Sequence, residues 1–284
     1  MALKVRPAVQ GTDDAALRAL CRAHDPDDYP LRYWRWFWQT ATEVLLATDG
    51  SGTPVGLCRR TTLPDRSSWI ATIRIHPQLR GQGLGRQLTA AAVERSHDDG
   101  LTTARLLTST GNIATATMLP RVGMHVRTNV AVWHAQVPAL PPQASLQEPS
   151  RPLESLQEAT RLLGTSSWIQ RSSGLVAGWY VMHEPTGPWL QRMIEGRALR
   201  QEEGGGAWFE WELDRGRGQV LAVQPVQWGS RLLQVLLRRA QLVRQQEVHL
   251  FLPADHHRAL ALEGAGFHPS PWANIGAIYQ GRTG

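Results

Sequence analysis

A glycine-rich loop between a strand and a helix constrains this chain more than any other feature of its sequence. Residues 69–75 alternate and include β-branched side chains, which is typical of a strand, and apolar residues at helical spacing begin at Leu84. Between them the chain reads Arg80-Gly81-Gln82-Gly83-Leu84-Gly85-Arg86. Glycine lets a backbone approach a ligand closely, and the first amides of a helix lack intrahelical partners. The segment therefore predicts a site for an anion such as a diphosphate.

Three kinds of phosphate-binding loop compete for this segment. A dinucleotide-binding fingerprint needs a third glycine where the chain has Arg86. A Walker loop needs a lysine after its last glycine, and the one lysine of the chain is Lys4. The pattern that fits is R-x-x-G-x-G, at Arg80, Gly83 and Gly85. A glycine turn that merely precedes a helix is the alternative without a ligand.

The first half of the sequence predicts a mixed α/β domain. Thr12 is expected to cap the first helix, and Pro30 is expected to open a second helix that continues through Gln39. Strands are expected at 3–9, 44–48, 55–62, 69–75, 104–108 and 124–137, and further helices at 84–98 and 112–121.

The second half repeats the later part of this order. Asn112 lies 11 positions before Gly123, and Asp255 lies 11 positions before Gly266, at an offset of 143 residues. Strands are expected at 207–213, 219–226, 247–252 and 271–279, with helices at 232–243 and 255–265. A proline-rich segment separates the halves, so we expect a whole-domain repeat, with domains at 1–137 and 153–284 and a linker at 138–152.

The loop and the elements around it resemble the GNAT superfamily of acyl-CoA-dependent N-acetyltransferases. The resemblance covers nearly all of the first half, and the second half is similar to the same fold in degenerate form. At the matching place it reads Val226-Gln227-Trp228-Gly229-Ser230-Arg231, which has one glycine and no R-x-x-G-x-G. The implied fold class is α/β, with two tandem GNAT-like domains, each a twisted mixed β-sheet flanked by helices. Tandem proteins such as the mycothiol synthase group have this layout.

The resemblance implies a site for acetyl-CoA, or another acyl-CoA, in the first half. In the family, the strand before the loop splays from the next strand, and the pantetheine arm pairs with its backbone. Asn112 matches an asparagine that often contacts this arm, although capping its own helix is an equally good interpretation. The implied cofactor-binding residues are Ile73, Arg74, Ile75, Arg80, Gly81, Gln82, Gly83, Leu84, Gly85, Arg86 and Asn112.

The catalytic residues usual in the family are not at their usual positions. Leu119 stands where a tyrosine general acid is expected, as does Leu262 in the second half, and residues 69–75 contain no carboxylate. His76 is the candidate general base, because imidazole titrates near neutrality; a purely structural position before Pro77 is the alternative. Weaker candidates for the base are Asp65, Glu43, Glu210 and Glu212.

An amine acceptor, either a small molecule or a peptide, follows from the resemblance. A lysine-type amine with a pKa of ~10.4 is almost fully protonated at neutral pH. The pKa of an α-amine, ~8, lies only about one unit above neutral pH, so a larger fraction of this amine is neutral. A site without an obvious carboxylate base therefore favours an acceptor of low pKa. The aromatic segment 33–38 would border the acceptor cleft or pack between the two halves.

Charge and composition restrict the other partners. The formal net charge is +6, and the first 140 residues hold 16 basic and 11 acidic side chains, against 14 and 13 in the rest. This favours an anionic ligand in the first half over a nucleic-acid surface. The sequence has no apolar run of membrane-spanning length, no signal-peptide pattern, and too few cysteines for a disulfide framework. We expect a cytoplasmic acyltransferase without membrane or nucleic-acid partners; the rival interpretation is a non-catalytic acyl-CoA-binding protein.

Overall fold

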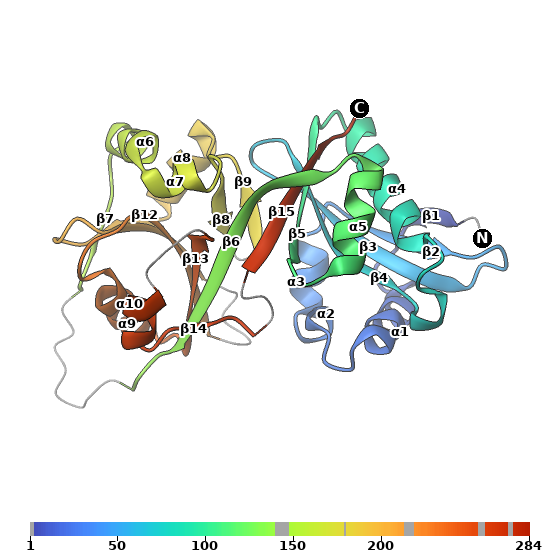
Figure 1. Cartoon of the computed structure of the whole chain (residues 1–284), viewed down its shortest axis with the longest axis horizontal. Coiled ribbons are helices and arrows are strands. Elements are labelled where there is room, and N and C mark those ends of the chain that lie inside the picture. Colours follow the sequence, from blue (N-terminus) through green and yellow to red (C-terminus); the bar gives the residue numbers. More distant parts are fainter. Residues whose placement is uncertain (1–2, 140–147, 179, 213–218, 255–258, 272–274) are drawn as a thin grey trace. The chain divides into compact units, whose positions relative to one another are not determined.

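The chain folds into two compact units, each assembled from segments that are distant in the sequence (Figure 1). The computed structural model describes residues 3–139, 148–178, 180–212, 219–254, 259–271 and 275–284. The first unit comprises Met1–Thr108, Asn112–Val126 and Tyr279–Gly284, and the second comprises Ser109–Gly111 and Arg127–Ile278. Both chain termini therefore belong to the first unit.

The C-terminal tail is fixed in the first unit by backbone and side-chain contacts. The Thr283 amide donates to the Thr102 carbonyl at 3.3 Å, and Arg105 Nε donates to Gln280 Oε1 at 2.7 Å. Gly281 lies so close to Gly123 that a Cβ would stand 2.6 Å from the Gly123 carbonyl oxygen. These long-range contacts give the units bounds that differ from the continuous domains expected at 1–137 and 153–284. Most of the expected linker at 138–152 lies outside the described residues.

The first unit is a mixed sheet with the strand order β1-β2-β3-β4-β5-β15. Neighbours from β1 to β4 are antiparallel, whereas β4 and β5 are parallel. Its strands are β1 (Lys4–Pro7), β2 (Glu43–Thr48), β3 (Pro54–Thr62), β4 (Ser68–Ile75), β5 (Thr103–Ser109) and, in part, β6 (His125–Gln136) and β15 (Ile275–Arg282). Its helices are α1 (Asp14–His24), α2 (Tyr29–Arg32), α3 (Trp34–Gln39), η1 (Pro77–Leu79), α4 (Leu84–Asp98), α5 (Ile113–Met118) and η2 (Leu119–Val122).

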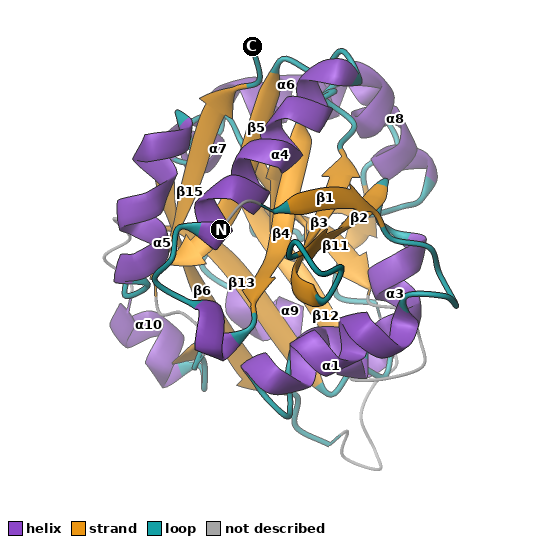
Figure 2. Ribbon diagram, turned by 90° about the vertical axis from the view of Figure 1, so that its right-hand side faces the viewer, coloured by secondary structure: helices purple, strands orange, loops and turns teal. Residues whose placement is uncertain are grey.

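Helices cover both faces of this sheet. On one face, Leu17 of α1 and Phe37 of α3 share a buried cluster with Leu57 of β3. On the other face, α4 lies against β3 and β4, and Gly56 allows Ile75 and Leu88 to approach the sheet. Figure 2 shows α4 in front of the strands that it covers. This packing fixes the N-terminal end of α4 at the end of β4.

Two expected helix starts differ in the structure. Helix α1 follows Asp13 rather than Thr12, because the Asp13 carboxylate accepts from Arg6 at 2.7 and 2.8 Å and from the Val9 amide at 2.7 Å. The single helix expected from Pro30 to Gln39 is two short helices that meet at Tyr33. Aromatic residues lose side-chain freedom in helices, so a run of them supports a continuous helix weakly.

The second unit repeats the later part of the order of the first, as expected, in the strand order β6-β13-β12-β11-β10-β7; β8 and β9 form a separate two-stranded sheet. Its elements are β7 (Arg151–Pro152), α6 (Leu156–Thr165), α7 (Ser167–Arg171), β8 (Val176–Gly178), β9 (Val181–His183), α8 (Gly187–Glu195), β10 (Leu199–Gln201), β11 (Ala207–Glu212), β12 (Val220–Gln227), α9 (Leu232–Leu242), β13 (Glu247–Pro253), α10 (Ala259–Gly264) and β14 (His268–Pro269).

Two buried clusters occupy the faces of the second sheet. Trp208 of β11 packs in one cluster with Leu236 of α9, and its neighbour Phe209 packs in the other cluster with Leu190 of α8. The expected first residues of the last helix, the first residues of the last strand and the hairpin turn between β11 and β12 lie outside the described residues. No helix in the described part of the chain has the length and apolar character needed to cross a bilayer.

Candidate functional site

The predicted glycine loop joins β4 to α4 in the first unit. After β4 the chain passes through His76 and η1, and α4 begins at Leu84 with Gly83 as its N-cap. Gly81 and Gly83 both have φ of +77°, in the left-handed region that favours glycine. The two glycines are exposed, and nothing lies within 4 Å of the place that a Cβ would occupy on either. The loop therefore presents backbone, not side chains, to the solvent.

The backbone amides of this loop are available to a ligand. Among the residues that the structure describes, the amides of Gly81 to Arg86 donate no hydrogen bond to another backbone group, and the first helical bond into the loop comes from Gln87 to the Gly83 carbonyl at 3.1 Å. A helix N-terminus with unpaired amides favours an anion through both hydrogen bonding and the helix dipole. The loop thus has the geometry of an anion cradle.

The two parallel strands beside the loop separate along their length. Strand β4 pairs with β5 only at Ser68 with Ala104 and at Trp69 with Arg105. In the described sheet, the remaining residues of β4 up to Ile75 have no partner on β5, although the Ile73 carbonyl accepts a hydrogen bond from Arg74 Nη1 at 3.3 Å. A splay of this kind is what the family resemblance implied for the pantetheine arm.

A bulge interrupts β4 where the two strands part. Cys58 of β3 stands opposite both Thr72 and Ile73, since the paired residues on either side are Leu57 with Arg74 and Arg59 with Ala71. Thr72 has φ of +54°, which is rare for a β-branched residue. Sequence analysis did not identify this bulge, because a register shift depends on the neighbouring strand.

Residues at the start of α2 contact the bulge. The Tyr29 hydroxyl hydrogen-bonds the Thr72 hydroxyl, and the Asp28 carboxylate forms an ion pair with Arg74 through two contacts of 2.7 Å. Desolvation raises the pKa of the Tyr29 phenol above its ordinary value. Although burial opposes the charge on Arg74, the Asp28 contacts outweigh it and raise the pKa of the guanidinium. The Arg74 side chain is thus held by Asp28, and its Nη1 also donates to the Ile73 carbonyl at 3.3 Å.

The loop arginines lie at different places around the cradle. Arg80 is exposed, and its Nη2 lies 2.8 Å from Nδ1 of His24, at the end of α1. Arg86 lines a cavity of about 490 Å³ along the outer side of α4, together with Gln87, Ala90, Val93, Glu94, His97, Arg121, Val122 and Thr283. Both cations therefore stand near the N-terminal end of α4 and add positive charge there.

Asn112 caps α5, as the structural interpretation predicted. Its Oδ1 accepts from the Thr115 amide at 3.2 Å, and its Nδ2 donates to the Thr108 hydroxyl at 3.1 Å. These bonds fix the direction of α5 at the end of β5. A contact between Asn112 and an acyl-CoA stays a prediction.

His76, the candidate base, is half-buried between β4 and η1. Its amide donates to the Val55 carbonyl at 2.9 Å, and its carbonyl accepts from Leu79 at the same distance. Its imidazole makes no hydrogen bond or ion pair with the described residues, so its ring nitrogens are open to solvent or substrate. Its catalytic role stays a prediction.

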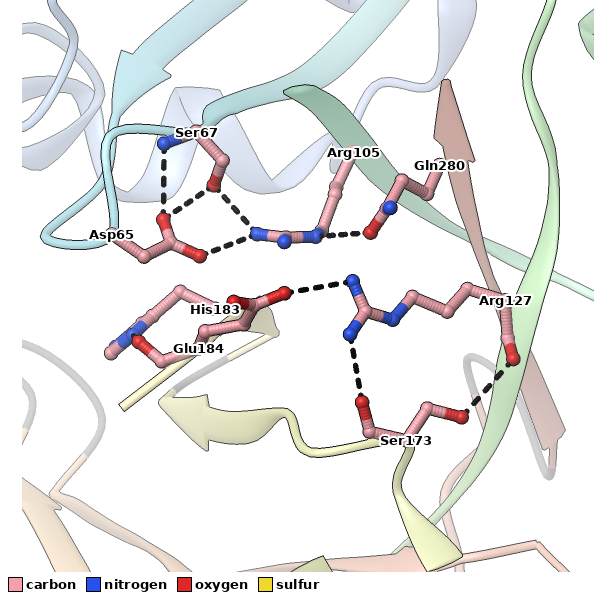
Figure 3. A network of polar contacts seen from close by, with 8 residues as sticks. All are labelled: Asp65, Ser67, Arg105, Arg127, Ser173, His183, Glu184 and Gln280. Atoms are coloured by element: carbon pink, nitrogen blue, oxygen red, sulfur yellow. Dashed lines mark hydrogen bonds and ion pairs between the residues drawn. The ribbon is translucent and has the colours of Figure 1, made fainter. Parts of the chain in front are cut away.

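Three of the four weaker candidates for the base are engaged in ion pairs. Asp65 lies 2.6 Å from Arg105, which also binds Gln280 (Figure 3). Glu43 contacts Arg60 and Arg95, and Glu210 contacts Arg239 and Arg200. The Glu212 side chain lies outside the described part. Figure 3 also shows a separate group within the second unit, in which Arg127 binds Glu184 and the Ser173 carbonyl.

The family's usual proton donor has no equivalent in the described site. Leu119 is fully buried at the start of η2, and Leu262 is fully buried on α10. The two cysteines are also buried, and burial raises the pKa of both Cys21 and Cys58 to about 12. Neither thiol is therefore a thiolate at neutral pH, and the structure offers no cysteine for a covalent acyl intermediate.

The aromatic segment packs within the first unit. Phe37 is fully buried, Trp34 stacks on it at 5.2 Å, and Arg59 lies 4.5 Å from the centre of the Trp36 ring. Arg59 is itself buried, which lowers the pKa of its guanidinium to about 10. Segment 33–38 thus supports α1 and β3 on the side of the sheet where α2 meets the bulge.

In the second unit a buried carboxylate lies beside the turn that corresponds to the glycine loop. Glu202 is 4% exposed, and it accepts hydrogen bonds from the amides of Gly204 at 2.6 Å and Gly206 at 3.0 Å. A Cβ on Gly229, in the turn before α9, would stand 2.3 Å from Glu202 Oε1. The Glu202 carboxylate therefore binds the turn between β10 and β11 and leaves no room for a side chain at Gly229.

Comparisons with known proteins agree with this reading of the first unit. Residues 14–124 match the model of the Acetyltransferase (GNAT) family. This stretch, which contains the loop, the splayed strand and α5, therefore belongs to the GNAT family of acetyltransferases. Membership in this family implies acyl transfer from an acyl-CoA. No curated protein sequence matches the chain.

Solved structures show that the whole chain has a tandem GNAT fold. A GCN5-related N-acetyltransferase from Sphaerobacter thermophilus aligns with a TM-score of 0.63 and 16% identity over 99% of this chain and 96% of the other. A putative acetyltransferase from Thermoplasma acidophilum gives 0.57 and 13% over 99% and 93%. A tandem GNAT protein from the clavulanic acid biosynthesis pathway gives 0.56 and 16% over 100% and 99%. At such identities the likeness concerns the fold alone.

Proposed function

We propose that the protein is an N-acetyltransferase that moves an acetyl group from acetyl-CoA to an amine acceptor. The observation that carries the proposal is the row of unpaired amides from Gly81 to Arg86 at the start of α4, beside a β4 that leaves β5 after Trp69. The amides would hold the diphosphate, and the backbone of Ile73 to Ile75 would pair with the pantetheine arm. We propose that the acceptor is a small-molecule or peptide amine, that the reaction takes place in the cytoplasm, and that neither a membrane nor a nucleic acid is a partner.

The reaction we propose is direct attack. The amine nitrogen forms a bond to the thioester carbonyl carbon, the C–S bond breaks, and coenzyme A leaves after its sulfur gains a proton. A backbone amide of the bulged part of β4 would stabilise the oxyanion, and holding the two reactants together would supply much of the rate. The two protonated, buried cysteines agree with a reaction that has no acyl-enzyme.

Proton transfer in this reaction would involve His76. His76 would accept the amine proton, either directly or through water. An acceptor of low pKa, such as an α-amine, needs less help from a base than a lysine-type amine. We therefore propose an acceptor whose amine is partly neutral at physiological pH.

A non-catalytic acyl-CoA-binding protein is the second candidate. The observation that favours it is the fully buried Leu119, together with the ion pairs that engage Asp65, Glu43 and Glu210. Such a protein would use the same loop to bind the cofactor, and would transfer no acyl group.

Two measurements on one preparation separate the candidates. Calorimetry with acetyl-CoA tests binding, and release of free thiol over a panel of α-amines and ε-amines tests transfer. The proposed function predicts binding together with an acceptor-dependent release of thiol. Binding without transfer to any amine in the panel would contradict the enzyme and favour the binding protein, and absence of binding would contradict both.

A further inference from the structure

Two adjacent residues at the start of α2 hold β4 across its bulge. The Asp28 carboxylate contacts Arg74 Nε and Nη2 at 2.7 Å each, and the Tyr29 hydroxyl hydrogen-bonds the Thr72 hydroxyl. Asp28 is 5% exposed, so the ion pair is largely shielded from water. The two contacts flank Ile73, and we call the four residues Asp28, Tyr29, Thr72 and Arg74 the α2 clamp.

The clamp acts on a strained part of the backbone. Thr72 is β-branched and has φ of +54°, a region that L-residues with branched side chains rarely adopt. Such conformations persist only where the surroundings over-determine them, and they concentrate at functional sites. The hydroxyl of Thr72 is the group through which Tyr29 contacts this residue.

The bulge decides where the following amides point. Successive backbone groups of a strand alternate in direction, and an extra residue in one strand shifts this alternation and twists the strand. Here the shift occurs at Thr72 and Ile73, within the part of β4 that has no partner on β5 in the described sheet. A change in this bulge would therefore change which backbone amides of residues 73–75 face a ligand beside β4.

We propose that the α2 clamp is a positioning device for acyl transfer, in which Tyr29 and Asp28 hold Thr72 and Arg74 so that the bulge amides face the thioester carbonyl. Tyr29 and Asp28 are positioning residues, since they act through β4. The inference rests on the proposed function of the loop and the splayed strand. It adds that α2 controls the rate of the chemical step while the glycine loop controls the affinity for the cofactor.

The clamp can be tested with variants that remove one hydroxyl each. Tyr29→Phe and Thr72→Val break the bond, whereas Thr72→Ser keeps a hydroxyl at the same position. Tyr33→Phe is the matched control, because the Tyr33 hydroxyl makes no hydrogen bond with the described residues. Each variant is compared with the parent in its dissociation constant for acetyl-CoA, in kcat with the best amine, and in amide hydrogen exchange over residues 68–76.

The expected result separates chemistry from binding. Tyr29→Phe and Thr72→Val should lose less in affinity for acetyl-CoA than in kcat, since the Gly81–Arg86 amides are untouched and only the pairing of β4 with the pantetheine arm is loosened. Their kcat should fall at least about tenfold, which equals about 1.4 kcal/mol of barrier, and exchange over residues 68–76 should become faster. Thr72→Ser and Tyr33→Phe should match the parent in all three measurements.

Other outcomes would overturn the clamp. Unchanged exchange in Tyr29→Phe would show that the hydroxyl does not hold β4. Faster exchange with an unchanged kcat would show a structural contact without a role in transfer. The parent protein tests the proposed function by itself, because a parent that transfers acetyl groups to no amine refutes that function. A loss of kcat confined to Tyr29→Phe and Thr72→Val supports the clamp.

Discussion

Replacing Gly83 by valine should damage cofactor binding far more than it damages the fold. Gly83 is the N-cap of α4, with φ of +77° and no atom within 4 Å of its absent Cβ. A branched residue in this conformation costs on the order of 1–3 kcal/mol, and each kcal/mol shifts the melting temperature of a chain of this size by about 2–4 °C. A change of φ at position 83 that relieves this strain would turn amides of the loop away from the diphosphate. Loss of one charge-assisted hydrogen bond, about 1.5–3 kcal/mol, weakens binding roughly 10- to 150-fold.

Gly100→Val is the matched control for this experiment. Gly100 follows the other end of α4, with φ of +71° and equally open space around it, so it carries the same strain without a role in the loop. Calorimetry with acetyl-CoA and thermal melting of both variants make the comparison. We expect the melting temperature to fall equally in both variants. The affinity for acetyl-CoA should fall only in Gly83→Val. Parent-like affinity in a folded Gly83→Val protein would refute the reasoning.

Four further outcomes are expected. Calorimetry should give one acetyl-CoA per chain, because the corresponding turn of the second unit has one glycine, Gly229, with the Glu202 carboxylate beside it; two per chain would contradict this. His76→Gln should lower kcat/KM and flatten the acid side of its pH profile, and an unchanged profile would exclude His76 as the base. An α-amine acceptor should react faster than an ε-amine at pH 7, and the difference between the two rates should become smaller as the pH rises. A strong preference for the ε-amine would argue against an acceptor whose amine has a low pKa. Hydrogen bonds from Arg6 lower the pKa of Asp13 to about 2, so its stabilising effect is present above pH 4 and is lost as the pH falls toward 2. The free energies of unfolding of the parent and Asp13→Asn, measured by urea denaturation, should therefore differ at pH 6 and converge near pH 2. A difference that stays constant with pH would contradict a stabilising interaction between Arg6 and Asp13.

Local patterns in the sequence predicted the elements around the loop. Alternation in 69–75, the glycines at 81, 83 and 85, and the apolar spacing after Leu84 are all local signals, and β4, the loop and α4 appear where they were expected. The R-x-x-G-x-G pattern also led to the correct family for residues 14–124. These features depend on neighbours in the chain, so they can be read without knowing which strands pair.

Features that depend on distant residues were not predicted. The bulge at Thr72 exists because β3 supplies one residue where β4 supplies two, and its contact with Tyr29 joins positions 43 residues apart. The place of the tail in the first unit depends on Arg105 meeting Gln280, 175 residues away. The role of Glu202 was also missed, because an acidic residue in a glycine-rich turn ordinarily indicates an exposed loop.

A structure of the protein with acetyl-CoA bound tests the central claim most directly. The account predicts diphosphate oxygens within about 2.7–3.2 Å of backbone nitrogens between Gly81 and Arg86, and a pantetheine arm along β4 toward Thr72. A diphosphate held elsewhere, with these nitrogens facing only water, would contradict the account.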